Sequence, residues 1–152
     1  MAKYPEITRF EAHFLREVAQ VIEEGRDENR LLTLHCGKPM GAVRQVRKDR
    51  WNPSKAVIRY RAYRDRLREA WPEGLTIPKA GLYLVFFCAA PASDPERIGR
   101  AVYPTPDGDN LEKAFFDALL KQDSMIWHIA GRAKIYAAPG NERIELVYPK
   151  PI

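Results

Sequence analysis

Two aspartates, Asp107 and Asp109, stand at the start of a segment with a helical pattern and are the residues best placed to do chemistry. If residues 106–109 are extended, both carboxylates point to the same side. Lys113 follows Asp109 by four residues, about one helical turn, so it can face the same space. Asp123 follows just beyond the helix, and it joins the pair if the next strand packs beside that helix. These four side chains form the candidate catalytic group.

Acidic side chains in this number predict a metal site. Three carboxylates that converge on one point repel each other unless a cation lies between them. Mg²⁺ takes few protein carboxylates, keeps several waters and leaves room for phosphate oxygens, which suits phosphodiester hydrolysis. Lys113 would then hold the scissile phosphate or stabilise developing charge, and Asn110, at the helix start, would donate to a phosphate.

The same residues also have a purely structural interpretation. Asp-Gly-Asp-Asn at 107–110 is a good turn and capping sequence, with Asp109 capping a helix over 110–121. A calcium loop of the EF-hand type does not fit, because Glu112 occupies the position that requires Gly. A metal site and a capping turn therefore both remain open at this point.

Basic residues are concentrated in one stretch of the chain. Residues 38–68 contain eleven Lys and Arg against two Asp, a local charge of +9, although the net charge of the chain is only +5. A concentrated positive field favours a polyanionic partner, of which nucleic acid is the commonest. The alternative is a solvated basic helix face without a partner.

The first predicted helix covers residues 8–24. Thr8 and Glu11 have the spacing of a capping box, and Gly25 suits the C-terminal stop. Every fourth residue is apolar, which predicts one buried stripe formed by Phe10, Phe14, Val18 and Ile22.

The rest of the chain alternates strands and helices. Residues 38–54 have no clear period, and they are predicted to form a long loop that becomes ordered on binding. A turn at 139–142 is predicted to lead into a final hairpin strand. The other strands are predicted at 31–36, 82–90 and 126–137, and the other helices at 55–71, capped by Ser54, and at 110–121. The mixture predicts a two-layer α+β domain with helices packed on a mixed sheet.

Length and composition limit the class of protein. A chain of 152 residues suits one domain with one core. No apolar run approaches the roughly 20 residues that span a bilayer. The N-terminal sequence MAKYPEITRF has no signal-peptide stretch, so we expect a cytoplasmic protein that does not act in a membrane. Cys36 and Cys88 lack metal-ligand spacing and are expected to be buried hydrophobic residues.

Several segments resemble the RusA family of Holliday junction resolvases. PDGDNLEKAFFDAL, at 106–119, resembles the family signature, in which an Asp-x-Asp-Asn-Leu-x-Lys run leads into a helix that ends Asp-Ala-Leu. QDSMIWHIAGRAK, at 122–134, is similar to the acidic segment and the strand that follow. GKPMGAVRQVRKDRW and YRAYRDRLREAW are similar to the basic loop and helix of phage-type members. The resemblance covers about 31–148, so residues 1–28 would be an N-terminal helical extension and 29–152 the RusA-like domain.

The resemblance implies a function and a set of site residues. RusA proteins are homodimeric endonucleases that bind four-way DNA junctions and nick paired strands symmetrically, with Mg²⁺ or Mn²⁺. It implies that Asp107, Asp109 and Asp123 are the metal-binding catalytic acids and that Lys113 is the essential lysine. The implied DNA-binding residues are Lys38, Arg44, Arg47, Lys48, Arg50, Lys55, Asn110 and Lys134. Thr105, Gln122 and Met125 depart from the family pattern.

Trp51, within the basic loop, has two interpretations: it stacks at a DNA branch point, or it is a buried anchor of the loop. For the whole chain, the first hypothesis is a Mg²⁺-dependent, structure-selective endonuclease that resolves four-way junctions by paired symmetric nicks. The second is a non-catalytic module of the same fold that binds branched DNA. A third is a flap or branch nuclease with loose junction preference.

Overall fold

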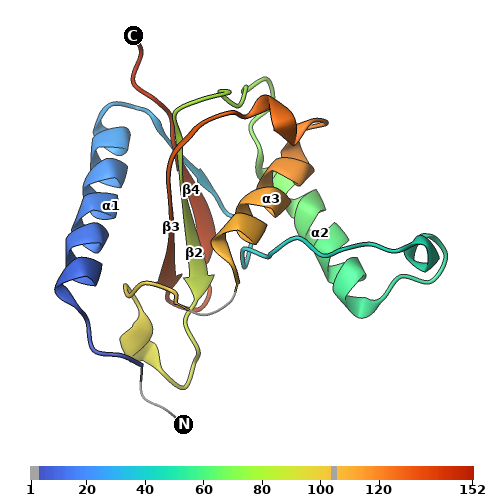
Figure 1. The fold of residues 1–152 in the computed structure, drawn as a ribbon, viewed down its shortest axis with the longest axis horizontal. Helices are drawn as coiled ribbons and strands as arrows, with labels where there is room; N and C mark the ends of the chain where they lie inside the picture. Colours follow the sequence, from blue (N-terminus) through green and yellow to red (C-terminus); the bar gives the residue numbers. More distant parts are fainter. Residues whose placement is uncertain (1–3, 104–105) are drawn as a thin grey trace.

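The computed structural model describes residues 4–103 and 106–152, apart from the Asp123 side chain. The described part is an α+β fold of three helices and a four-stranded mixed sheet (Figure 1). The predicted order of helices and strands is confirmed. The helices are α1 (Arg9–Asp27), α2 (Lys55–Ala70) and α3 (Gly108–Leu119), and the strands are β1 (Leu31–Leu34), β2 (Leu82–Ala89), β3 (Ile129–Ala137) and β4 (Arg143–Val147). Short 3-10 helices lie at Arg47–Arg50, Pro95–Arg97 and Asp123–Met125.

The strand order of the sheet is β1-β4-β2-β3. β2 and β3 are parallel, whereas β4 is antiparallel to both of its neighbours, β1 and β2. The predicted hairpin of the last two strands is therefore wrong, because β2 lies between β3 and β4. The physical reason is that Glu145 is buried as well as Ile144 and Leu146. β4 is thus covered on both faces, as a central strand is.

The outer edge of β3 is partly covered by the chain that leads to the candidate acids. The backbone N–H of Val102 donates to the Lys134 carbonyl at 3.0 Å, and the Tyr136 N–H donates to the Arg100 carbonyl at 2.9 Å. These bonds form a short antiparallel bridge between Ala101 and Ile135.

Helices cover both faces of the sheet (Figure 1). α2 and α3 pack together on one face, around a core that includes Tyr63, Phe86 and Phe115. α1 covers the other face, where it contacts Val85 and Phe87. The sheet and the α2–α3 pair are the two predicted layers, and the N-terminal helix adds a third. Among the described residues, no helix is long and apolar enough to cross a bilayer.

The buried side of α1 differs from the predicted stripe. Phe10 and Phe14 are 79% and 55% exposed, so their predicted burial is wrong. The side that meets the sheet carries Glu11, Leu15, Val18, Ile22 and Gly25. The helix also continues through Gly25 to Asp27, so Gly25 is not the stop. A Cβ at Gly25 would lie 2.8 Å from the Val147 side chain, so glycine allows α1 to approach β4 closely.

Glu11 explains why the helix faces the sheet in this way. The Thr8 hydroxyl accepts from the Glu11 N–H at 3.0 Å, which confirms the predicted cap. The Glu11 carboxylate does not complete a capping box; it binds the Arg100 guanidinium at 2.6 and 2.9 Å. It also accepts from the Ala101 N–H at 3.2 Å and from the Tyr103 hydroxyl. The Arg100 hydrogen bonds, with those of Tyr103 and Ala101, hold the pKa of Glu11 at about 2.

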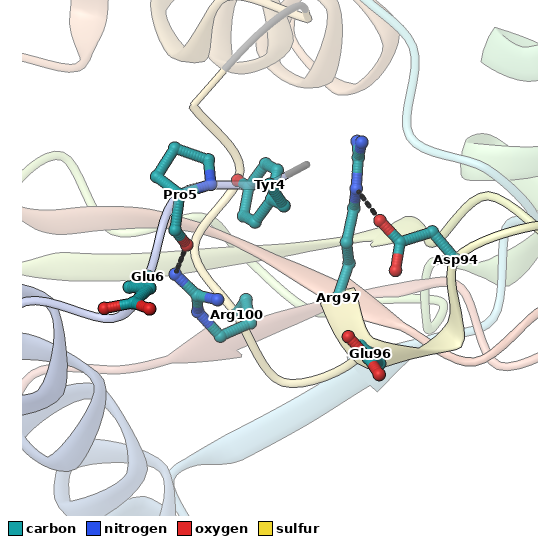
Figure 2. Close-up of a pocket in the computed structure, with 7 residues that line it drawn as sticks. All are labelled: Tyr4, Pro5, Glu6, Asp94, Glu96, Arg97 and Arg100. Atoms are coloured by element: carbon teal, nitrogen blue, oxygen red, sulfur yellow. Dashed lines mark hydrogen bonds and ion pairs between the residues drawn. The ribbon is translucent and has the colours of Figure 1, made fainter. Parts of the chain in front are cut away.

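The segment before α1 reinforces this junction. The Tyr4 hydroxyl donates to the Ala101 carbonyl. Figure 2 shows that Arg100 donates to the Pro5 carbonyl, at 2.7 Å. The Arg97 guanidinium lies 4.5 Å from the centre of the Tyr4 ring. The N-terminal segment and α1 are therefore bound to the chain that leads into the candidate acids.

Replacement of Glu11 by Gln should lower the free energy of unfolding by about 3 kcal/mol at pH 7, because the Arg100 guanidinium loses its carboxylate partner. Urea unfolding followed by circular dichroism measures this change. Glu23→Gln, on the exposed side of the same helix, is the matched control and should change the value by less than about 0.5 kcal/mol.

The pH dependence of the same pair of proteins provides a second readout. Folding lowers the pKa of Glu11 from 4.5 to about 2, so its contribution to stability is complete above about pH 5. The contribution is lost as the pH falls from 4.5 toward 2. The difference between wild type and Glu11→Gln should narrow over that range, and a constant difference would contradict the assigned role.

Candidate functional site

The start of α3 carries the two candidate acids. The helix begins at Gly108 with Asp107 as its N-cap residue, so the prediction that Asp109 caps the helix is wrong. The condition that residues 106–109 be extended is not met, since residues 108 and 109 are already helical. The Asp107 carboxylate is exposed and makes no capping hydrogen bond within the described helix. Both negative charges thus lie at the positive end of the helix dipole.

Arg132, on β3, is a member of this site that the sequence did not indicate. Its Nη1 atom lies 2.7 Å from Oδ1 of Asp109 and 3.5 Å from Oε1 of Glu112. A Cβ at Gly108 would lie 2.6 Å from Nε of Arg132, so the guanidinium crosses the first residue of the helix and would have to shift if that residue had a side chain. The sequence feature that could have indicated Arg132 is the alternation of side chains along a strand, which places Arg132 on the same face of β3 as Lys134.

Lys134 lies two residues further along β3 and binds the chain just before the helix. Its Nζ atom donates to the Pro106 carbonyl at 2.9 Å. The side chain is half-buried, so its ammonium group is less accessible than those of the basic loop. Lys134 therefore positions the approach to Asp107, whereas its predicted contact with DNA stays a prediction.

The third predicted acid lies elsewhere along the chain. Asp123 belongs to the 3-10 helix that follows the C-terminal end of α3, and its side chain is outside the described part of the structure. The twelve residues of α3 (Figure 1) span about 18 Å, and Asp107 precedes this helix whereas the Asp123 backbone follows it. The described backbone of one chain therefore does not bring the three acids together. A metal role for Asp123 remains a prediction of the resemblance.

Asp107 and Asp109 still offer donors that suit Mg²⁺. Among the described side chains, no group of three or more His, Cys, Asp and Glu residues lies close enough to hold a metal. Mg²⁺ needs only one or two protein carboxylates, because waters and substrate phosphates complete its shell. Asp107 is exposed, and the Asp109 side chain is 82% exposed. The two carboxylates fit such a site, although a metal ion would have to compete with Arg132 for the Asp109 carboxylate.

Lys113 lies four residues after Asp109 on the exposed side of α3. Residues four apart share one helix face, so the predicted proximity of the two side chains is compatible with the helix. Within the described residues, Lys113 forms no ion pair. Its ammonium group is therefore available to a ligand at the start of α3.

Asn110 joins the acidic helix start to the basic loop. Its side-chain Nδ2 donates to the Ala42 carbonyl at 3.1 Å, and the Ala42 N–H donates to the Asn110 backbone carbonyl at 3.2 Å. A Cβ at Gly41 would lie 2.5 Å from the same Nδ2, so the loop presses directly on this side chain. In the structure Asn110 thus anchors the loop rather than presenting its amide to solvent.

Residues 38–54, here called the basic arm, project from the body of the protein as the cyan to green segment of Figure 1. The arm is held in shape by Asp49, which is only 3% exposed. Its carboxylate accepts from the Val46 N–H at 2.7 Å and from the Ser54 N–H at 3.1 Å. These backbone hydrogen bonds hold the pKa of Asp49 below its usual value.

A second contact braces the arm against α2. Arg61 donates to the Gln45 side chain at 2.9 and 3.1 Å and to the Asp49 carbonyl at 3.1 Å. Ser54 caps α2 as predicted, since its hydroxyl accepts from the Val57 N–H at 3.2 Å. These contacts give the arm a defined conformation, and the ordering of the loop on binding stays a prediction.

The predicted DNA-binding side chains of the arm and of the first residue of α2 are all exposed: Lys38, Arg44, Arg47, Lys48, Arg50 and Lys55. None of them forms an ion pair with a residue in the described ranges. Several arginines of α2 differ, because they hold the fold: Arg66 donates to the Cys36 carbonyl and Arg68 to the Ala118 carbonyl. The charge available to a polyanion is therefore concentrated on the arm.

The two cysteines have the structural role expected of them. Both Cys36 and Cys88 are free and buried. Burial raises the pKa of each thiol to about 11, so neither is a thiolate at neutral pH.

Comparison with known protein families, with curated proteins and with solved structures found no match. The candidate site therefore stands on its own geometry.

Replacement of Arg132 by Gln should increase affinity for Mn²⁺, a spectroscopic substitute for Mg²⁺, by about two- to fivefold. The change removes the cation that competes for Asp109, and that factor corresponds to an exposed ion pair of about 0.5–1 kcal/mol. Electron paramagnetic resonance of free Mn²⁺ measures the affinity. Arg16→Gln, at an exposed position of α1, is the control. Weaker Mn²⁺ binding by Arg132→Gln would show that Arg132 does not compete with a metal.

Proposed function

We propose that the protein is a Mg²⁺-dependent, structure-selective DNA endonuclease that resolves four-way junctions by paired symmetric nicks. The observation that carries the proposal is the pair of hydrogen bonds between Asn110 and Ala42. These hydrogen bonds join the basic arm to the helix end that bears Asp107 and Asp109. A nuclease needs both parts at a fixed separation, because contacts of the arm with the DNA backbone must position the phosphate on which the acids act.

The proposal gives each residue of the site a role. Asp107 and Asp109 would hold the metal at the start of α3. A bound Mg²⁺, or Mn²⁺, would supply charge stabilisation and an activated water. Lys113, on the exposed side of the same helix, would contact the scissile phosphate. Arg132 would exchange its bond with Asp109 for one with a phosphate oxygen.

Paired symmetric nicks require two active sites related by a two-fold axis. A homodimer supplies them with one kind of subunit and an isologous interface. We therefore include a homodimer in the proposal, and we place the reaction in the cytoplasm, where a four-way DNA junction would be accessible.

A second candidate function is a non-catalytic module that binds branched DNA. Two observations favour it: the ion pair of Arg132 with Asp109 and the distance of the Asp123 backbone from the start of α3. In this candidate the acids stabilise the helix start, and only the basic arm acts on DNA. A flap or branch nuclease is a variant of the first function, and flap, fork and four-way substrates offered in parallel separate the two.

Replacement of Asp109 by Asn should abolish cleavage of a labelled synthetic four-way junction in Mg²⁺ while binding is retained or strengthened. The reason is that the variant loses a metal ligand and one negative charge that faces phosphate. Denaturing gels measure the nicks, and fluorescence anisotropy with EDTA measures binding.

Asp27→Asn, an exposed acid at the far end of α1, is the matched control and should cleave as the wild type does. Tight binding by wild-type protein without cutting in either Mg²⁺ or Mn²⁺ would favour the binding module. Loss of junction binding in Asp109→Asn would give that residue a role in the interface rather than in the chemistry.

The triple variant Arg44→Ala, Arg47→Ala, Lys48→Ala should weaken binding to every DNA alike. The affinity falls with salt, and each lost phosphate contact makes the slope of log affinity against log salt less steep by about 0.9. The magnitude of the slope should therefore decrease by up to roughly 3. A salt titration of duplex and junction binding measures this. A control variant that loses the same number of charges from α1, at Arg9, Arg16 and Arg26, should leave the slope unchanged. Equal effects of the two triple variants would show that the arm is not part of the DNA interface.

A further inference from the structure

We infer that the basic arm holds one unpaired nucleotide, with its base stacked on Trp51 and its phosphate bound at Arg47 and Arg50. The inference rests on the proposed function, since DNA is the ligand that it assumes. It adds a recognition site, separate from the acids, that distinguishes an unpaired nucleotide from paired duplex.

Exposure of Trp51 is the first observation. The side chain is 70% exposed, so the interpretation as a buried anchor of the arm is wrong. Apolar side chains of this size are normally buried, whereas a flat exposed indole is the surface on which proteins stack single-stranded bases. The Arg50 guanidinium lies 5.7 Å from the centre of the indole ring. Sites for single-stranded DNA typically combine an aromatic ring, on which the base stacks, with a nearby cation that attracts the phosphate.

A hollow on the arm that is lined by arginines, among them Arg50, is the second observation. It is formed by Gln45, Val46, Arg47, Arg50 and Arg61. Arg61 is committed to Gln45 and to the Asp49 carbonyl, so it fixes the wall of the hollow. Arg47 and Arg50 are exposed and form no ion pair within the described residues, which leaves them available to a phosphate. Arg50 belongs both to the hollow and to the surroundings of the indole.

Preorganisation of the arm is the third observation. The backbone N–H of Trp51 donates to the Lys48 carbonyl at 3.1 Å, and the backbone N–H of Asn52 donates to the same oxygen at 2.8 Å. The backbone that carries the indole is thus fixed by the 3-10 helix and by the buried Asp49. A stacking surface that is already in place loses little entropy on binding. An unpaired base can reach it, whereas a paired base is held inside its duplex.

The test compares binding to two duplexes of the same sequence, one fully paired and one with a single-nucleotide bulge. Fluorescence anisotropy is measured with EDTA present, so that cleavage plays no part. Wild type should prefer the bulged duplex. Trp51→Ala should lose about five- to 150-fold of affinity for it, the range that base–aromatic stacking gives, and should keep its affinity for the paired duplex. Trp51→Phe should retain part of the preference.

Trp127→Ala is the matched control, because Trp127 is 76% exposed and lies outside the arm. It should keep the wild-type preference. A 2-aminopurine base at the bulge supplies a direct readout: its fluorescence should be quenched by wild type and not by Trp51→Ala. Circular dichroism checks that both alanine variants are folded.

The outcomes separate this inference from the proposed function. Equal affinity of wild type for both duplexes, or an unchanged preference in Trp51→Ala, overturns the inference and leaves the endonuclease proposal in place. Absence of binding to any DNA overturns both. Loss of the preference in Trp51→Ala supports the inference even if wild type fails to cut junctions, in which case only the catalytic proposal fails.

Discussion

The parallel pairing of β2 with β3 decides where the candidate acids and their basic partners on β3 lie. Parallel neighbours need a crossover, and α3 is that crossover, so it runs back across the sheet between the two strands. Its first residues therefore lie beside the middle of β3, within reach of Arg132 and Lys134. Its last residues lie at the opposite end, where the Trp127 N–H donates to the Lys79 carbonyl. The acids at 107 and 109 belong to one end of this unit, and the backbone of Asp123 belongs to the other.

Local signals in the sequence predicted local structure well. Thr8 and Ser54 were expected to cap helices, and each does so through a side-chain bond to an amide three residues ahead. Predictions that depended on distant partners were less successful. Hydrophobicity alone favours burial of Phe14, but the helix turns Glu11 inward, because the buried carboxylate meets Arg100 some ninety residues later. No window of sequence contains both members of that pair.

The candidate site shows the same division. The sequence located Asp107 and Asp109 at the mouth of a helix, although it assigned the cap to the wrong one, because either aspartate can precede a first turn. Arg132 was missed, since its proximity to Asp109 depends on the register of β3 against β2. The expected return of Asp123 required the chain to fold back along α3, whereas the parallel crossover leads it to the far end of the sheet.

The basic arm separates the residues that keep its shape from those that face solvent. Asp49 and Arg61 maintain the loop, and the bonds between Ala42 and Asn110 attach it to α3. Within the described residues, the exposed Lys and Arg side chains of the arm form no ion pairs. Substitutions at the surface of the arm therefore cost little folding stability. Ligand preference can evolve on this scaffold almost independently of the core, and the arm is a natural segment to exchange when the binding specificity of such a domain is redesigned.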